Sequence, residues 1–190
     1  MSTTGPPSTK AARTRGALLA AAFDLFGRQG YEQTTVAQIA GAVGVTEMTF
    51  YRHFGSKDQL LIDDPYDPLI AQAIGEQPTE LPPLARAVRG IRLAWRRLPI
   101  GDGEPVRERV AIAAATPSLL PALRASTAAT ETAIAQQLVA DGADPTAAAI
   151  AAAAAMAALM TGLMRWAVAD GGALGAAIER SLDVLEPPHE

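Results

Sequence analysis

The sequence predicts an all-α protein of about nine helices, arranged as a three-helix N-terminal domain and a larger helical C-terminal domain. Three observations lead to this fold class. Apolar residues recur three or four positions apart through most of the chain, as they do on one face of an α-helix. Threonine, aspartate and glycine stand at the ends of these periodic segments, where helices are capped. The uncharged run at residues 145–164 is mostly alanine, the strongest helix former.

Composition restricts the class of protein before any motif is considered. The net charge of −4 argues against an evenly basic surface for nucleic acid. Residues 1–60 carry six Lys/Arg against four Asp/Glu, whereas residues 61–190 carry ten against sixteen. The absence of cysteine excludes disulfides and thiolate metal sites and favours the cytoplasm. The first ten residues lack the apolar core of a secretion signal.

Residues 34–57 contain two short predicted helices joined by a tight turn. Thr35 and Gln38 are spaced as in a capping box, which predicts a helix that begins at Val36. Gly44 marks its end, because glycine adopts the left-handed backbone conformation of a helix C-cap at little cost. This arrangement is typical of a helix-turn-helix, whose second helix enters the major groove of DNA.

The second helix of the motif, residues 47–53, carries most of the predicted DNA contacts. Thr46 is its N-cap, and Phe50 and Phe54 form its inward face. Its outward face mixes hydrogen-bond donors, apolar tips and one permanent cation, which suit base edges and phosphates. That face comprises Glu47, Met48, Thr49, Tyr51, Arg52 and His53.

Two further helices complete the predicted N-terminal domain. Ser56 and Gln59 repeat the capping pattern, which predicts a helix over residues 56–62. Lys57 lies in its first turn, where exposed N–H groups attract a phosphate. Residues 9–29 predict a long first helix. Its first turns hold three cations, which either contact phosphates or form an ordinary solvated terminus: Lys10, Arg13 and Arg15.

These residues closely resemble the N-terminal signature of the tetracycline-repressor (TetR) family of bacterial transcriptional regulators, over about residues 10–62. The matching segments are Phe26 to Gly30 with Tyr31, Thr34-Thr35-Val36, Ile39-Ala40, Ala42 to Thr46, and Thr49 to Lys57. Met48 departs from the signature, which often has glycine there, and methionine favours a helix by about 0.8–1 kcal/mol. Its thioether is also able to touch a thymine methyl group.

The resemblance implies an organisation and a set of roles. We expect a disordered arm at residues 1–8, a DNA-binding domain at 9–62, and a regulatory and dimerisation domain at 63–188. By resemblance, the residues that position the DNA backbone are Thr35, Thr49, Tyr51, His53 and Lys57, and the residues that read bases are Glu47, Met48 and Arg52. The imidazole of His53 has an alternative role, in which it is partly buried and stabilises the helix end.

The C-terminal domain is predicted to contain six helices. Pro65 ends the helix at 56–62, which breaks the long connecting helix that is usual in the family. Asp63, Asp64 and Asp67 are explained by capping and by the neighbouring prolines, so we expect no metal site and no cofactor. The first of the six predicted helices begins at Asp67. The other five cover residues 83–98, 105–115, about 120–139, 145–169 and about 174–185.

The resemblance also implies a small-molecule pocket within residues 65–140, and its candidate residues are Arg92, Trp95 and Thr116. Five arginines lie off the apolar stripe of residues 83–98. They form either a second nucleic-acid surface or a solvated face that pairs with the acidic remainder of the domain, and we favour the latter. These residues are Arg86, Arg89, Arg92, Arg96 and Arg97.

The Ala-rich helix at 145–169 is apolar on two faces, which predicts two packing partners. A bulky stripe runs from Met156 to Ala167. A stripe of small residues and the last helix together predict a four-helix interface between two copies of the chain, formed by Ala151, Ala155, Ala158, Gly162, Leu174, Ile178 and Leu182. One alternative is a buried central helix of a monomer. A membrane span is disfavoured, because alanine contributes little to insertion.

The predicted function is a cytoplasmic, dimeric transcriptional repressor that binds a palindromic operator in double-stranded DNA. By analogy with the family, a small-molecule effector in the C-terminal domain relieves binding, and no membrane is involved. The alternatives are a DNA-binding regulator without a ligand, or an activator. An enzyme is the least favoured class, because the chain has two histidines, no cysteine and no Gly-rich phosphate loop.

Overall fold

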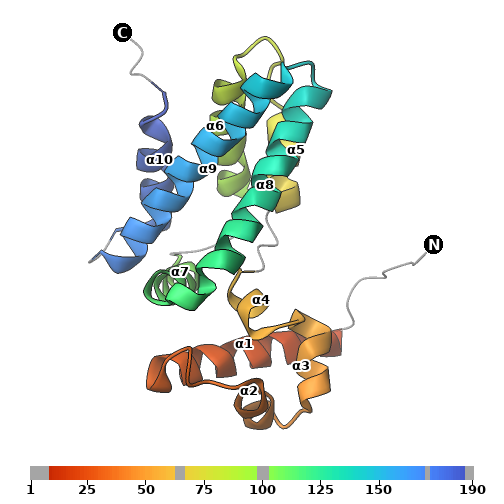
Figure 1. Ribbon diagram of the computed structural model, residues 1–190, viewed down its shortest axis with the longest axis vertical. Helices are drawn as coiled ribbons and strands as arrows, with labels where there is room; N and C mark the ends of the chain where they lie inside the picture. The colour runs from red at the N-terminus through yellow and green to blue at the C-terminus, as the bar shows by residue number, and fades with distance from the viewer. Residues whose placement is uncertain (1–8, 63–66, 98–102, 170–171, 187–190) are drawn as a thin grey trace, which may run out of the picture. The chain divides into compact units, whose positions relative to one another are not determined.

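A computed structural model of the chain describes residues 9–62, 67–97, 103–169 and 172–186 (Figure 1). These residues form ten α-helices and one 3-10 turn and contain no strand, which confirms the all-α class. The helices correspond to the ten segments named from the sequence, of which four rather than three lie in the N-terminal unit. The chain divides into two compact units, residues 1–63 and 64–190. The expected disordered arm at residues 1–8, the break at Pro65 and the aspartates at 63 and 64 lie outside the described residues.

The N-terminal unit contains helices α1 (Thr9–Gln29), α2 (Val36–Val43), α3 (Glu47–Phe54) and α4 (Lys57–Ile62). The capping box at α2 is present, because the Thr35 hydroxyl accepts from the Gln38 N–H while the Gln38 side chain accepts from the Thr35 N–H. Gly44 has φ +72° at the C-cap of α2. The core of this unit includes Leu18, Ala22, Phe26, Ile39, Phe50, Phe54 and Leu60.

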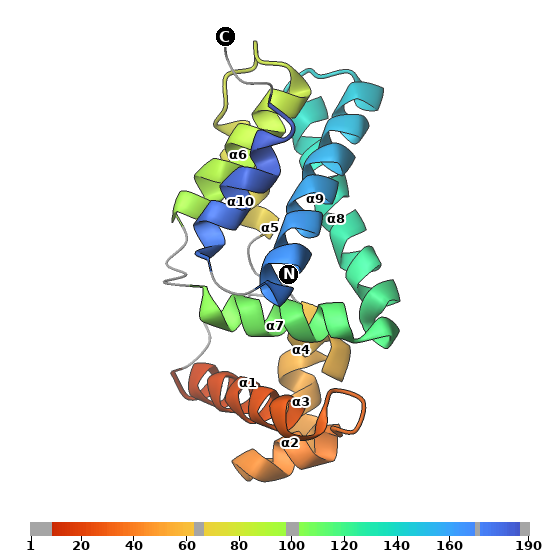
Figure 2. The ribbon, with the colours of Figure 1, turned by 90° about the vertical axis from the view of Figure 1, so that its left-hand side faces the viewer.

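The C-terminal unit contains six α-helices, one of which is central (Figure 2). They are α5 (Asp67–Gly75), α6 (Pro83–Arg97), α7 (Glu104–Ala115), α8 (Leu120–Ala140), α9 (Pro145–Val168) and α10 (Leu174–Asp183), and the 3-10 turn (Pro117–Leu119) precedes α8. The α9 helix packs against α6, α7, α8 and α10. This central position explains why its sequence is apolar on more than one face.

By length and composition alone, α9 is able to cross a membrane. Core helices of soluble proteins also satisfy that criterion. Nine of its residues, from Ala148 to Ala167, are buried within the unit. They belong to the same hydrophobic core as Ile91 of α6 and Ile178 of α10. The structure therefore uses α9 as a core helix.

Four of the five arginines on α6 form ion pairs with acidic residues of the same unit. Arg92 binds Glu179, Asp183 and Glu186. Arg96 binds Glu179, and Arg97 binds Glu76 through both guanidinium nitrogens. The pairing alternative therefore describes this helix better than a second nucleic-acid surface.

Arg86 is the most buried of the arginines on α6, with a side chain that is only 2% exposed. Its guanidinium donates to the carboxylate of Asp141 at the end of α8 and to the carbonyl of Ile74 in α5. Gln137 donates to the same carboxylate. Hydrogen bonds from Gln137 and then from Arg86 lower the pKa of Asp141 below its ordinary value.

Most of the residues predicted for the dimer interface are buried within one subunit, where α9 packs against α10. Five of the seven proposed residues are buried inside one subunit: Ala151, Ala155, Leu174, Ile178 and Leu182. A Cβ at Gly162 would lie 1.6 Å from the Ser181 hydroxyl oxygen. The prediction of a close helix approach was right, but the approaching helix is intramolecular. These five side chains are therefore not available at the surface of one subunit, whereas Ala158 and Gly162 are partly exposed.

Candidate functional sites

The outward side of α3 is open to solvent. Met48 is 74% exposed and Tyr51 is 45% exposed, although both side chains are large. Glu47 and Arg52 are also exposed, whereas Thr49 and His53 are half-buried. The inward residues Phe50 and Phe54 are buried, with ring centroids 5.3 Å apart. A short helix with this division presents a mixed polar and apolar face to a partner.

The N-terminal helix supports the end of α3 through Arg15. Its guanidinium lies 4.3 Å from the centroid of the Phe54 ring and donates to the His53 carbonyl at 3.3 Å. A cation near the C-terminus of a helix is favourable, because the carbonyls there carry partial negative charge. Arg15 therefore holds α3 in place, whereas Lys10 and Arg13 remain exposed.

A cleft of about 440 Å³ lies between the start of α1 and the outward side of α3. Its lining includes Lys10, Thr14, Thr49, Arg52 and His53. Two cations and two hydroxyl-bearing side chains around one concave surface suit a phosphate oxygen. The sequence pattern indicated the cations of α1, but it did not indicate that Lys10 and residues of α3 line the same cleft.

Lys57 has a different environment from the one that its position suggested. Its ammonium group donates to the carbonyls of Tyr31 and Thr34, at 2.8 and 2.9 Å, and lies 4.0 Å from the centroid of the Tyr31 ring. The Tyr31 hydroxyl donates to Asp58, and burial together with this bond raises the pKa of Tyr31. Lys57 thus joins α4 to the segment between α1 and α2, and its expected role as a phosphate ligand needs revision.

The two predicted capping threonines occupy the starts of the motif helices. The Thr46 hydroxyl accepts from the Thr49 N–H at 3.3 Å and lies 3.1 Å from the Thr49 hydroxyl. Thr35 is exposed while it caps α2. Both residues therefore set the position of a helix end at the surface of the motif.

The three residues proposed for a ligand pocket do not come together. Arg92 is held by three carboxylates, two on α10 and one just beyond it. Trp95 packs against the hydrophobic core, and the hydroxyl of buried Thr116 donates to the Ile112 carbonyl. The structure instead forms an apolar groove between α8 and α9, which sequence periodicity did not reveal. The spacing of Met156, Met160 and Met164, four residues apart on α9, was the feature of the sequence that could have indicated this groove.

Together, the helix-turn-helix with its exposed second helix and the all-α second unit define a DNA-binding transcriptional regulator. Comparison with protein families agrees with this class. The family described as bacterial regulatory proteins, tetR family, matches residues 18–63. The MftR C-terminal domain matches residues 81–190, more than half of the chain. The chain belongs to the TetR family of transcriptional regulators.

Individual relatives agree with the family and the fold. The HTH-type transcriptional regulator TcmR of Streptomyces glaucescens is 38% identical over 99 residues, which span 51% of this chain and 44% of that protein.

Three solved structures resemble the fold, each with a TM-score of 0.59. NalD, the secondary repressor of the MexAB-OprM multidrug efflux pump in Pseudomonas aeruginosa, has 21% identity, with 93% of this chain and 95% of NalD covered. The fatty acid degradation regulator FadR from Bacillus halodurans has 15% identity, with both chains fully covered. The SmeT–triclosan complex has 20% identity, with 90% of this chain and 91% of SmeT covered.

Proposed function

We propose that this protein is a dimeric, ligand-responsive transcriptional repressor that acts in the cytoplasm on a palindromic operator. The observation that carries the proposal is the exposed side of α3, on which Met48, Tyr51 and Arg52 are available to a DNA groove. TetR-family regulators bind operator DNA and form dimers. For this chain, the operator, the interface and the effector are parts of the proposal.

In the proposed complex, the side chains of α3 divide into readers and positioners. Glu47, Met48 and Arg52 read base edges from the exposed face. Arg52 also lines the cleft with Lys10. In the proposed complex, a backbone phosphate occupies this cleft next to the bases that Arg52 reads. The residues that position the motif on the DNA backbone are Thr35, Thr46, Thr49, Tyr51 and His53. Lys57 contributes through the fold of the motif.

A dimer is part of the proposal because one short helix reads few base pairs. Each good bidentate base contact contributes about 1–3 kcal/mol of discrimination, too little to select one operator in a genome. Two copies double the reading surface and require half-sites about one helical turn or a multiple apart.

The exposed side of α9 supports a dimer surface different from the stripe predicted from sequence. Ile150 is 65% exposed, and Ala153 follows it at helical spacing on the same exposed side. Ala157 and Thr161 continue that side and also line the edge of the groove between α8 and α9, so a dimer would border the groove there. Val184, just beyond α10, is 82% exposed. These side chains are apolar or small and carry no charge, so a second copy is the occupant that we propose for them.

Replacement of Ile150 by glutamate tests this surface. The substitution puts a charge on an exposed side chain, so the subunit should fold normally while dimerisation fails. We expect the wild-type protein to sediment as a dimer and the Ile150→Glu variant as a monomer with weakened operator binding. A variant that still sediments as a dimer would show that the interface lies elsewhere.

Ligand response is proposed on two grounds. The C-terminal unit holds an apolar groove of small-molecule size, and SmeT, a structural neighbour, has been solved with triclosan. An effector releases the operator only if it binds the DNA-incompetent state more tightly than the competent state.

DNA binding itself is tested by titration of the purified protein against the intergenic DNA upstream of its own gene over a range of salt concentrations. Because phosphate contacts release counterions, affinity should fall steeply as salt rises. Mutation of either half-site should weaken binding. A protein that binds neither this nor neighbouring intergenic DNA would contradict the proposed function.

A further inference from the structure

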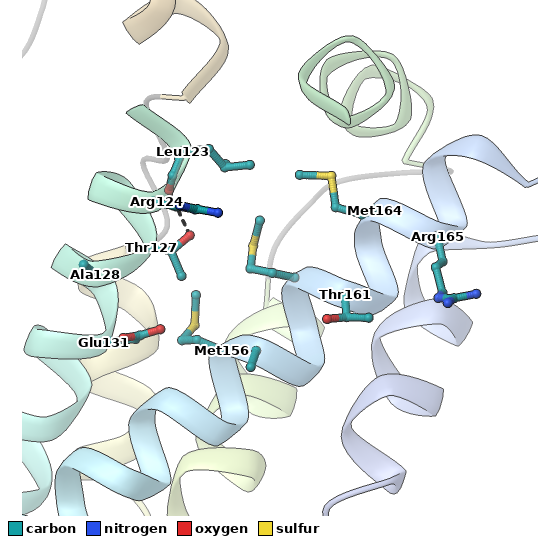
Figure 3. A pocket seen from close by; sticks show the side chains of 11 residues that line it. Leu123, Arg124, Thr127, Ala128, Glu131, Met156, Thr161, Met164 and Arg165 are labelled. Carbon is teal, nitrogen blue, oxygen red and sulfur yellow. Dashed lines mark hydrogen bonds between the residues drawn. The ribbon is translucent and has the colours of Figure 1, made fainter. Parts of the chain in front are cut away.

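A groove of about 540 Å³ lies between the first half of α8 and the second half of α9 and has the size of a small-molecule site (Figure 3). Its floor and walls are mainly apolar. On the α9 side, Met156, Met160 and Met164 follow one another at four-residue spacing. On the α8 side, the lining includes Leu123, Thr127 and Ala128.

The methionines give the groove a specific chemical character. Methionine makes up five of the 190 residues, and three of those five line this groove. Thioethers are polarizable and make favourable contacts with aromatic rings. Thr127 donates its hydroxyl proton to the Leu123 carbonyl at 3.0 Å, which reduces its capacity to bind a polar ligand. A flat aromatic ring therefore suits the space between the helices better than a polar molecule.

Two opposite charges stand on the α8 wall. Arg124 and Glu131 are seven residues apart on one helix, which corresponds to about 10 Å along its axis. Among the residues that the structure describes, neither has a hydrogen-bonding or ionic partner. Figure 3 shows the guanidinium of Arg124 beside Thr127 and turned toward the groove, whereas Arg165 projects on the other side of α9. Arg165 also belongs to the lining, at its α9 edge. The α8 wall thus offers one cation near Leu123 and one carboxylate two turns away.

We infer that this groove binds a polycyclic aromatic molecule with a single anionic group. The rings lie against the three methionines and the anion binds Arg124. Glu131 repels a second anion at the opposite end, which selects monoanions over dianions. This inference rests on the proposed ligand response and names the class of effector for it.

Two commercial probes with the same ring system test the inference on the full-length protein. One is 8-anilino-1-naphthalenesulfonate, which is anionic, and the other is N-phenyl-1-naphthylamine, which lacks the sulfonate. Fluorescence titration should show tighter binding of the anionic probe. Arg124→Gln should weaken the anionic probe about tenfold, because a charge-assisted hydrogen bond is lost, and should leave the neutral probe unchanged.

Arg89→Gln is the matched control, since it removes one exposed arginine from α6 in the same unit. This variant should bind both probes like the wild type. Equal losses in the two arginine variants would overturn the inference, because they would indicate a general charge effect. Equal affinity of the wild type for the two probes would also overturn it.

Methyl-labelled methionine gives a direct structural readout by NMR. Bound aromatic rings should shift the methyl signals of Met156, Met160 and Met164 through ring currents. Met48 should be unaffected by the probes, because it lies on α3, and should shift when operator DNA is added. Probe-induced shifts at Met48 without shifts at the three groove methionines would place the site elsewhere.

The same samples separate this inference from the function on which it rests. If the anionic probe binds as described but leaves operator affinity unchanged, the proposed ligand response fails while the assignment of the groove stands. If a second copy of the chain fills the groove, neither probe will bind the dimer, and the inference is overturned even when operator binding is intact. Sedimentation of each sample identifies the dimer.

Discussion

Replacement of Lys57 by methionine removes an ammonium group and keeps most of the apolar stem. The ammonium donates two hydrogen bonds to the backbone, at 2.8 and 2.9 Å, and lies 4.0 Å from the Tyr31 ring centroid. A hydrogen bond to a charged group contributes about 1.5–3 kcal/mol, and an exposed cation–π contact about 0.5–1 kcal/mol. Lys57 is only partly buried, so water compensates for part of these interactions when the ammonium group is removed. We therefore expect the free energy of unfolding of the N-terminal unit to fall by about 2–3 kcal/mol.

Two measurements report the stability of each unit separately: urea unfolding followed by tryptophan fluorescence, and amide hydrogen exchange. Both tryptophans, Trp95 and Trp166, lie in the C-terminal unit, so their fluorescence should report an unchanged transition in the Lys57→Met variant. Amide hydrogen exchange at Ile39 and Ala40, which are buried in α2, should become faster.

DNA binding by the same variant separates a structural role from a phosphate contact. If Lys57 supports the fold, affinity falls alike for all sequences and the salt dependence keeps its slope. If Lys57 binds a phosphate, the slope falls by about one and the unit keeps its stability. The second result would refute the reasoning from the structure and restore the role suggested by the position of Lys57 in the chain.

Three further substitutions test separate parts of the account. Gly90→Ala places a Cβ 2.7 Å from the Ile74 Cα atom, so thermal unfolding should show a loss of about 1–3 kcal/mol, whereas Gly175→Ala, which meets no atom within 4 Å, should be neutral or slightly stabilising. Asp141→Asn leaves buried Arg86 without its charged partner and should cost about 3 kcal/mol at neutral pH. Because the folded-state pKa of Asp141 is lowered, the wild type keeps this contribution above the ordinary pKa of 3.8 and loses it as the pH falls further, so the wild type should show a steeper decline in acid than the variant. Arg52→Ala should relax base preference at one position of each half-site in a competition assay, and uniform weakening over all sequences would assign Arg52 to the backbone instead.

Most of the fold was predictable because each helix is specified locally. Thr35, Gly44 and Thr46 cap helices through bonds to residues three or four positions away, and such contacts are visible in the sequence. The long helices α1, α6 and α9 were predicted to within about one residue at each end for the same reason. Their apolar periodicity and their caps agree with each other.

The partners of individual side chains were less predictable, because they depend on contacts between distant elements. The small-residue stripe of α9 predicted a close helix, but no local pattern distinguishes a helix of the same chain from one of a second copy. Arg86 and Lys57 lie at positions that look solvated, and their acceptors are supplied by residues 55 and 26 positions away. Residues of the α8–α9 groove are likewise distant in sequence, so the sequence did not point to this groove and named Arg92, Trp95 and Thr116, which the structure does not bring together.

A dimethyl sulfate footprint on the operator tests the central claim most directly, since the reagent methylates guanine N7 in the major groove. If two copies of α3 enter the DNA, the protein will protect two clusters of guanines separated by about one helical turn or a whole multiple of it. Met48→Ala and Arg52→Ala should alter these protections without loss of folding. Binding that leaves every major-groove guanine reactive, or that protects one cluster only, would contradict the account.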